Sequence, residues 1–377
     1  MMRQRRRGLW LVFAVVLFGL AAWLMMSGQG EEEAPPPPKV AFPNRMRPAE
    51  RERMEKRRTY VAPVVDAGTV AQQQPIRPSD PVLAALPRGK GKTAVVIEAN
   101  AIRHSPIGEM LLECLMNREG AELERFKKET GVDPFQDLDR MVLTDDGVIL
   151  SGNFGDERLK NLLTSRGSTN YDYGDSARLF EPPVPQPRPD GSTRRNGPQV
   201  GLWNNQMLVF GRSADGVKEV IDRVEGRGPD EPPVISESST YGEMYGVLSS
   251  EQLKKLFPKE QQELAARLAE VAENVELHVD ASSDFAMTAQ VKGPDAAKVT
   301  DLGKSLGGAL SLARMQAQAE GKTEMAQLLD FAKVRPDDNE FKLELAVPLE
   351  VIKQQLAFCR EQQSAQDEKS QEASPTP

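Results

Sequence analysis

The sequence predicts an α+β protein that is held at a membrane by an N-terminal transmembrane helix. Three observations predict this: an apolar run at residues 8–26, a proline-rich stretch over residues 31–90, and hairpin patterns that alternate with amphipathic helical patterns beyond it. Hairpins separated by helices favour antiparallel sheets with helices packed on one face. We therefore expect a membrane helix, a disordered linker and an α+β body.

Residues 1–30 carry the membrane signal. Residues 8–26 read GLWLVFAVVLFGLAAWLMM without a charge; four arginines precede this run and three glutamates follow it. As a helix the run rises about 28 Å, enough to cross a hydrocarbon core. Arginines favour the cytoplasmic side, so the chain is predicted to pass the inner membrane once. Its N-terminus would be cytoplasmic and its body periplasmic or outside the cell.

A cleaved signal peptide is the alternative interpretation of this run. Its apolar region is usually about 7–15 residues long and ends at a small-x-small site. The run here is longer and ends in the bulky residues Trp23, Leu24, Met25 and Met26, and no cysteine follows for lipoprotein processing. We expect an uncleaved signal-anchor, and either outcome leaves the body on the far side of the membrane.

Residues 31–90 are predicted to form a disordered linker. They include the tetraproline at residues 35–38 and many later prolines, a composition that buries too little apolar surface to fold and favours polyproline II. Within this linker, residues 45–58 (RMRPAERERMEKRR) have a helix-forming composition. They are interpreted either as a solvated charged helix or as a basic contact with lipid headgroups or an acidic polymer.

The charge balance limits the partners of the body. The chain has 48 basic and 56 acidic residues, and because its N-terminal region is basic, the body that follows is strongly acidic. An acidic body argues against nucleic acid, since neutralising phosphates requires a basic face. It also argues against flat adhesion to anionic lipid.

The first half of the body, residues 91–228, shows strand and helix patterns with clear turn signals. In order, these predict a strand (93–99), a helix starting at Ser105-Pro106, a second helix (121–130) ended by Gly131, a hairpin (141–144 and 148–154), a helix (156–165), a strand (178–180), a hairpin around Asn204-Asn205 (199–203 and 207–211) and a helix (215–225).

The second half, residues 235–360, follows a proline-rich break at 228–234. Its patterns predict a strand (244–248), helices (250–257 and 259–273), a hairpin (275–279 and 285–291), a long helix (294–319), a shorter helix (324–332), a hairpin (333–335 and 340–347), a last helix (349–358) and a disordered tail (361–377). Both halves read strand, helix pair, hairpin, helix, hairpin, helix. This order suggests two related halves, although no residue-level repeat accompanies it.

The string GVDPFQDLDR at residues 131–140 is the most distinctive motif. Its Asp133, Asp137 and Asp139 raise the question of calcium, but the glycine and closing glutamate of a calcium loop are missing. A structural connector is favoured over a metal or ligand site. Arg140 is expected to pair with one of the aspartates.

This string resembles a G-V/I-D-P-F-x-D-L-D-R connector found in uncharacterised, membrane-anchored or lipoprotein-like envelope proteins of myxobacterial type. Those proteins also tend to pair a proline-rich tether with an α+β body. The similarity covers the first half of the body best and the second half only loosely. The resemblance implies this architecture and an envelope location, and it implies no activity or site.

Few residues have a pattern typical of a nucleotide or metal site. Gly91-Lys92-Thr93 resembles the end of a phosphate-binding loop, but Leu86 stands where that loop requires glycine, so a flexible basic lead-in is expected. The two histidines are too few and too scattered for zinc. His104 is expected beside a helix cap, and His278, which alternates with core residues of a strand, is expected to face solvent.

No catalytic, cofactor-binding or metal-binding residue is predicted. The chain lacks a Gly-x-Ser-x-Gly elbow, no carboxylate pair stands out, and aromatic residues make up only 6%, which is poor for a carbohydrate-stacking cleft. Cys114 and Cys359 are interpreted as buried free thiols or as a disulfide between the C-terminal helix and the first half.

The sequence therefore favours a non-enzymatic binding or scaffold module, held outside the cytoplasm by residues 8–26. Its sheet edges or acidic faces would recruit an envelope protein partner, with no cofactor and no nucleic acid. One alternative is an inner-membrane component of a secretion or energy-coupling machine, which shares this architecture. Another is an envelope hydrolase using Asp/Glu chemistry, which predicts two carboxylates converging in a pocket near Asp133, Asp137 or Asp139.

Overall fold

The computed structural model describes residues 42–58, 80–165, 169–182, 198–256, 262–337, 339–354 and 356. The apolar run 8–26, the tail 361–377 and Cys359 lie outside these residues. Within the described part of the chain, no helix is both long and apolar enough to cross a bilayer. The chain divides into an N-terminal unit, residues 43–248 with 277–282, and a C-terminal unit, described mainly over 249–276 and 283–356.

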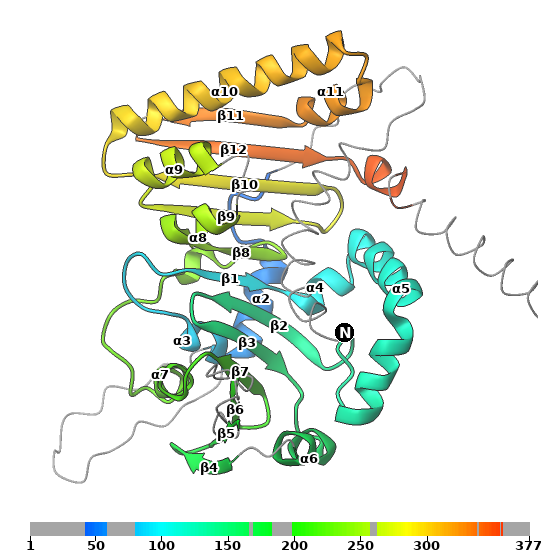
Figure 1. The fold of residues 1–377 in the computed structure, drawn as a ribbon, viewed down its shortest axis with the longest axis vertical. Helices are drawn as coiled ribbons and strands as arrows, with labels where there is room; N and C mark the ends of the chain where they lie inside the picture. The colour runs from blue at the N-terminus through cyan, green and yellow to red at the C-terminus, as the bar shows by residue number, and fades with distance from the viewer. Residues whose placement is uncertain are drawn as a thin grey trace, which may run out of the picture. The chain divides into compact units, whose positions relative to one another are not determined.

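The N-terminal unit is built on an antiparallel sheet with the strand order β9-β8-β1-β2-β3-β7-β6-β5-β4 (Figure 1). The strands are β1 (Ala94–Ile97), β2 (Leu138–Thr144), β3 (Gly147–Gly152), β4 (Thr169–Tyr173), β5 (Ala177–Glu181), β6 (Gln199–Trp203), β7 (Met207–Gly211), β8 (Met244–Ser249) and β9 (Asn274–Asp280). Strand β9 begins in the C-terminal unit and ends in the N-terminal one.

Helices of the N-terminal unit occupy most of the predicted positions. They are α2 (Pro48–Arg57), α3 (Pro81–Ala85), α4 (Ala99–Arg103), α5 (Pro106–Thr130), α6 (Glu157–Ser165) and α7 (Ala214–Val224), with a short 3-10 helix at Glu237–Ser239. Two helices were predicted where α5 runs without a break, because Gly120 costs an exposed helix only about 1 kcal/mol. Its ends are as predicted: the Ser105 hydroxyl accepts from Gly108 N, and Gly131 closes it at φ 73°.

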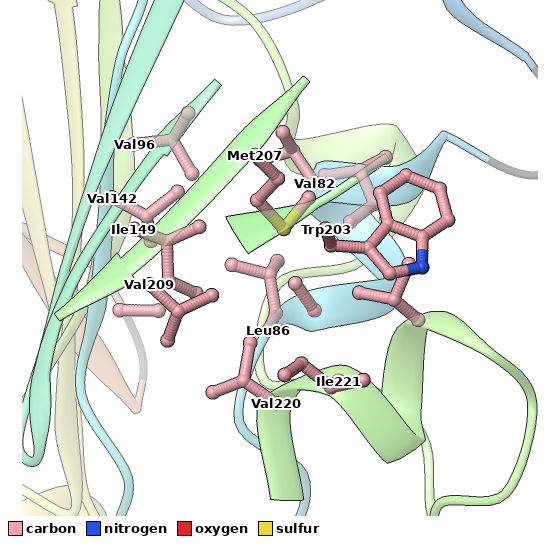
Figure 2. Close-up of a cluster of buried hydrophobic side chains, with 14 of the residues drawn as sticks. Val82, Leu86, Val96, Val142, Ile149, Trp203, Met207, Val209, Val220 and Ile221 are labelled. Carbon is pink, nitrogen blue, oxygen red and sulfur yellow. The ribbon is translucent and has the colours of Figure 1, made fainter. Parts of the chain in front are cut away.

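The main core of this unit lies between the sheet and two helices, α3 and α7. Figure 2 shows valine and isoleucine side chains of the strands facing α3 and α7. These residues are Val96, Val142, Ile149 and Val209 from the strands, Val82 and Leu86 from α3 and its end, and Val220 and Ile221 from α7. Helix α7 approaches the sheet closely at Gly201, where a Cβ would lie 2.7 Å from Val217 Cγ1.

Part of the segment predicted as disordered linker is folded into this core. Asp80 caps α3 by accepting from Val82 N, and Pro81 occupies its first turn. Val82, Ala85 and Leu86 have no exposed surface. The proline content was the misleading signal, because proline at a first helical position stabilises a helix start. The prediction of disorder over 31–90 is therefore wrong for α2 and for residues 80–90.

The C-terminal unit has strands in the order β9-β10-β12-β11, also antiparallel. Its elements are β10 (Phe285–Lys292), β11 (Ala332–Asp337), β12 (Glu340–Val347), α8 (Ser250–Leu256), α9 (Gln262–Val271), α10 (Ala296–Ala319) and α11 (Thr323–Asp330), and residues 349–354 are helical. Helix α10 lies along β11 and β12 (Figure 1). Gly303 permits this packing, because a Cβ there would lie 2.9 Å from Phe341 Cβ.

The predicted α+β class with antiparallel sheets is confirmed. The two units are not divided at the proline-rich break at 228–234, since β8 pairs with β1 from Ala94↔Val247 to Ile97↔Met244. One pattern of neighbouring strands occurs twice, as β1-β2-β3-β7-β6 and as β8-β9-β10-β12-β11. In each case, one strand is followed by the two strands of a hairpin and then by a later hairpin with its second strand first. Descent of the halves from one duplicated unit stays a prediction.

Candidate docking site

Helix α2 is bound to the N-terminal unit by its charged side chains. Its sequence, PAERERMEKR, has Met54 as its one large apolar residue. The start of the helix is fixed by Arg47, whose Nε and Nη2 donate to Glu50 Oε1 at 2.9 and 2.6 Å. Glu50 is itself buried, and the same oxygen accepts from Gly242 N at 2.9 Å. A positive φ of 90° at Gly242 aims that N–H at the carboxylate.

Arg47 lies among three carboxylates. Besides Glu50, its Nη2 is 2.9 Å from Glu243 Oε1 and its Nη1 is 3.1 Å from Asp280 Oδ2. Its Nη1 also donates to Ser282 Oγ at 2.7 Å. Burial lowers the pKa of Arg47, but the hydrogen bond to Glu50 and the charges of the carboxylates raise it more, so the net shift is upward. The guanidinium is thus held as a permanent cation at an acidic site.

Glu243 is placed to receive this cation. It is almost fully buried, and its Oε2 accepts from Ala281 N at 2.8 Å. Burial and the charge of Asp280 raise the pKa of Glu243, whereas the Ala281 amide and Arg47 lower it, and the net shift is upward. Three carboxylates, those of Glu50, Glu243 and Asp280, thus share the one guanidinium of Arg47.

The other end of α2 is held by two further arginines. Arg57 Nη1 donates to Glu98 Oε2 at 2.7 Å and its Nη2 to Asp139 Oδ1 at 3.1 Å. Arg58 Nη2 donates to Glu237 Oε2 at 3.2 Å. We call the carboxylates of Glu98, Asp139, Glu237, Glu243 and Asp280 the acidic docking site.

A buried polar network lies beneath this site. Arg140 donates to both oxygens of Asp80, and Tyr245 donates from its hydroxyl to Glu98 Oε1 at 3.0 Å. Burial and the negative charge of Glu98 raise the pKa of Tyr245 well above its ordinary value, so it stays a neutral donor. A cavity of about 20 Å³ remains among these side chains, which is room for about one water molecule.

The contacts of α2 are therefore mainly electrostatic. The sulfur of Met54 meets the Thr240 hydroxyl at 3.7 Å, and little other apolar surface comes from the helix. Salt screens the more exposed Arg58–Glu237 pair more strongly than the pairs that Arg47 and Arg57 make with the buried Glu243 and Glu98. Segments with few apolar contacts open at low free energy.

Two of the three motif aspartates stay within their own connector. Asp133 accepts from Phe135 N and from Lys127 Nζ, and Asp137 accepts from Asp133 N. Burial raises the pKa of Asp133, but these donors lower it more, and the net shift is downward. Asp139 instead reaches Arg57 in the docking site.

Arg140 pairs mainly outside the motif. Its strong partner is Asp80, at 2.6 and 2.8 Å, and its Nε is 3.7 Å from Asp139 Oδ2. The expectation of a partner within residues 131–140 thus missed the main contact, because Asp80 comes from the segment predicted to be disordered.

Within the described part of the chain, His104, His278 and Cys114 do not assemble a site. His278 is buried, with its ring stacked on Tyr241 at 3.8 Å between centroids, so the solvent-facing prediction is wrong. His104 lies at the end of α4, where its Nδ1 is 2.7 Å from Asn100 O. Cys114 is half-buried on α5. Among the described residues, no group of three or more metal-binding side chains comes together.

Sequence reasoning named the helix-forming segment 45–58 but not its partners. Its two interpretations were a solvated charged helix and a basic contact with lipid headgroups or an acidic polymer, whereas the arginines of α2 meet carboxylates of the same chain. Those carboxylates are remote in sequence: Arg47 and Glu243 are 196 residues apart. The sequence feature that could have indicated this contact is the compact basic string at residues 45–58, in a chain whose body is acidic.

No protein-family model matches the chain, and neither does any curated protein. Among solved structures, one titled "Structure of crystal form I of TP0453" is similar over 73% of this chain and 96% of its own, at 12% identity and a TM-score of 0.37. A likeness at this level indicates neither a shared function nor a shared partner.

Proposed function

We propose that the protein is a membrane-tethered binding or scaffold module that presents its body on the extracytoplasmic side. The acidic docking site recruits a basic, arginine-bearing segment of an envelope protein, and α2 occupies that site in the absence of the partner. The placement of the Arg47 guanidinium among Glu50, Glu243 and Asp280 carries this proposal.

The membrane location is supported by the sequence. The charge-free run 8–26, with arginines before it and glutamates after it, has the length and flanks of a single-pass anchor. The proposed function is binding, without an enzymatic activity.

Features of α2 support its replacement in the acidic docking site by a segment of the partner protein. The helix is held by arginines at its two ends, Arg47 and Arg57, and it buries little apolar surface. A partner with arginines at similar spacing meets the same carboxylates, and bidentate arginine contacts give such recognition its specificity. Complementary charge also speeds the encounter of the two surfaces.

The hydrolase alternative requires two free carboxylates converging in a cavity. Asp80 and Glu98 do approach one cavity, but Asp80 is paired with Arg140, and Glu98 with Arg57 and Tyr245. Because the carboxylates of Asp80 and Glu98 are already ion-paired and hydrogen-bonded, a structural role is favoured for both.

A peptide of residues 45–58 tests the docking site directly. A fluorescent copy would be titrated into full-length protein in uncharged detergent, using the variant Arg47→Ala, in which the native α2 is loosened. We expect saturable binding that weakens as salt rises and that is lost in Arg47→Ala/Asp280→Asn. A scrambled peptide of the same composition is the control. Equal binding of the scrambled peptide, or no effect of Asp280→Asn, would overturn the site.

Crosslinking in intact cells tests the partner. The anchored protein would be crosslinked and captured, and its companions would be identified by mass spectrometry. Wild type, Arg47→Ala and Asp280→Asn would be compared with the matched control Arg51→Ala, which changes an exposed residue of the same helix. We expect one discrete envelope protein, enriched by Arg47→Ala and depleted by Asp280→Asn. Recovery of the protein alone from all variants, at good yield, would contradict the scaffold function.

A further inference from the structure

A second cavity of the N-terminal unit, of about 380 Å³, shares no residue with the acidic docking site. It lies between the loop 87–92, the turn between β2 and β3 at Thr144–Asp146, α7 and the chain just after α7. Four cations line it: Arg88, Lys92, Arg223 and Arg227. Four acidic residues, Asp145, Asp146, Glu219 and Asp222, also line it, so the availability of each cation depends on its own partners.

Arg88 is held in place by its backbone and keeps donor capacity. It forms an isolated bridge with Pro233, and its Nη1 donates to Glu231 O at 2.6 Å. Its Nε is buried and has no hydrogen-bond partner among the described residues. An unpaired buried donor costs about 1–3 kcal/mol, so an acceptor at this position is favoured.

The guanidinium of Arg223 also uses only part of its hydrogen-bonding capacity. Its side chain is 11% exposed; its Nε donates to Ala85 O at 3.0 Å, while its Nη1 is 4.0 Å from Glu219 Oε2, beyond hydrogen-bond distance. Burial lowers the pKa of Arg223; Glu219 raises it, Arg88 lowers it, and Asp146 raises it, with a net downward shift. Among the described residues, the Arg223 guanidinium thus has no carboxylate within hydrogen-bond distance.

The acidic residues that also line the cavity are largely engaged elsewhere or exposed. Asp222 binds Arg227 and the Tyr173 hydroxyl, and Asp145 accepts from Thr93 N at 2.8 Å. The Glu219 side chain is 72% exposed to solvent. Asp146 remains as a local negative charge beside the arginines.

We infer that this cavity binds a small anion bearing a carboxylate or phosphate group, held by the guanidinium groups of Arg88 and Arg223 with Lys92 at the rim. A guanidinium group offers parallel donors that fit the oxygens of either anion. The volume suits a ligand of small-molecule size.

Equilibrium dialysis of full-length protein in uncharged detergent, at constant ionic strength, tests this inference. Radiolabelled inorganic phosphate is one probe and radiolabelled succinate the other. We expect at least one probe to bind saturably at one site per chain and to be displaced by excess unlabelled probe but not by chloride. Saturation by phosphate alone indicates a phosphoryl ligand, and saturation by succinate alone indicates a carboxylate.

Matched variants locate the binding. Arg223→Gln should weaken it about tenfold or more, because a charge-assisted contact is lost. Lys92→Gln, at an exposed residue that leaves folding intact, should weaken it several-fold, and Arg178→Gln, at an exposed arginine on β5, should leave it unchanged. Absence of saturable binding by both probes, or equal losses in Lys92→Gln and Arg178→Gln, would overturn the inference.

Discussion

Asp80 and Arg140 form a bidentate ion pair, with distances of 2.6 and 2.8 Å, and both side chains are almost completely buried. The pair joins the cap of α3 to β2, and it lies directly below the acidic docking site. A segment rich in prolines is thereby fixed to the central part of the sheet.

Breaking this pair should be strongly destabilising. Asp80→Asn leaves the Arg140 charge buried without its counterion, so we expect the free energy of unfolding to fall by about 3–5 kcal/mol. Asp80→Leu/Arg140→Met should recover most of this loss, because it removes both charges. Urea unfolding followed by circular dichroism measures each variant. The exposed pair Asp172–Arg178 is the control, and Asp172→Asn should cost under about 1 kcal/mol.

Leu86→Ala tests whether the chain around α3 belongs to the core. The Leu86 side chain is fully buried, so truncation should lower the free energy of unfolding by about 2–5 kcal/mol. Leu115→Ala, at an exposed position of α5, should change it by about 0.5 kcal/mol or less. Similar small effects of both changes in urea unfolding would show that residues 80–90 do not pack as described.

Gly201→Ala should introduce a clash between β6 and α7. The new Cβ would lie 2.7 Å from Val217 Cγ1, and overpacking of this kind costs about 1–3 kcal/mol. Adding Val217→Ala should relieve the clash, so the double variant should lose less than the sum of the single ones. Thermal unfolding of the four proteins gives this coupling. Gly308→Ala, where a Cβ meets nothing within 4 Å, should be neutral or stabilising.

Arg47→Ala should release α2 without unfolding the sheet. We expect hydrogen exchange of the α2 amides to become at least about tenfold faster, because charge-assisted hydrogen bonds are lost. Added salt should produce part of this effect in the wild type. Arg51→Ala should leave exchange unchanged, since Arg51 is exposed on the same helix. Faster exchange across β1 and β8 as well would instead indicate global destabilisation.

The Asp156 carboxyl should titrate unusually low. The hydrogen bonds from the side chain and backbone of Arg158 lower the pKa of Asp156 from 3.8 to about 2. Because its folded-state pKa is depressed, this contact stabilises the fold above pH 3.8, and the contribution is lost as the pH falls towards 2. Carboxyl NMR titration measures the midpoint. Arg158→Gln should move it upward, and an unchanged midpoint would assign the shift to another cause.

Local turn chemistry explains which parts of the fold were predicted from the sequence. The β6–β7 hairpin was predicted to the residue because Asn204 and Asn205 accept the left-handed conformation of a tight turn, with φ of 48° and 55°. Strand β4 was missed, because TNYDY is short and polar, although Tyr171 and Tyr173 pack against the core.

The docking site was less accessible to sequence reasoning than the fold. The helical tendency of α2 is local and was recognised, but its binding depends on Glu243 and Asp280, which only the tertiary structure brings to Arg47. His278 was misplaced for a similar reason. Its strand alternates, but Tyr241 covers the face that was expected to meet solvent.

The attachment of α2 also decides how far the body reaches from the bilayer. If residues 8–26 span the membrane as proposed, a docked Arg47 leaves residues 27–46 to bridge the gap, a contour of at most about 70 Å. When α2 is released, the body is next held at Asp80, and residues 27–79 extend to at most about 180 Å. The few ion pairs that hold α2 thus determine whether the tether between the membrane and the body is short or long. Under the proposed function, a partner that takes the place of α2 would also let the body reach targets farther from the membrane.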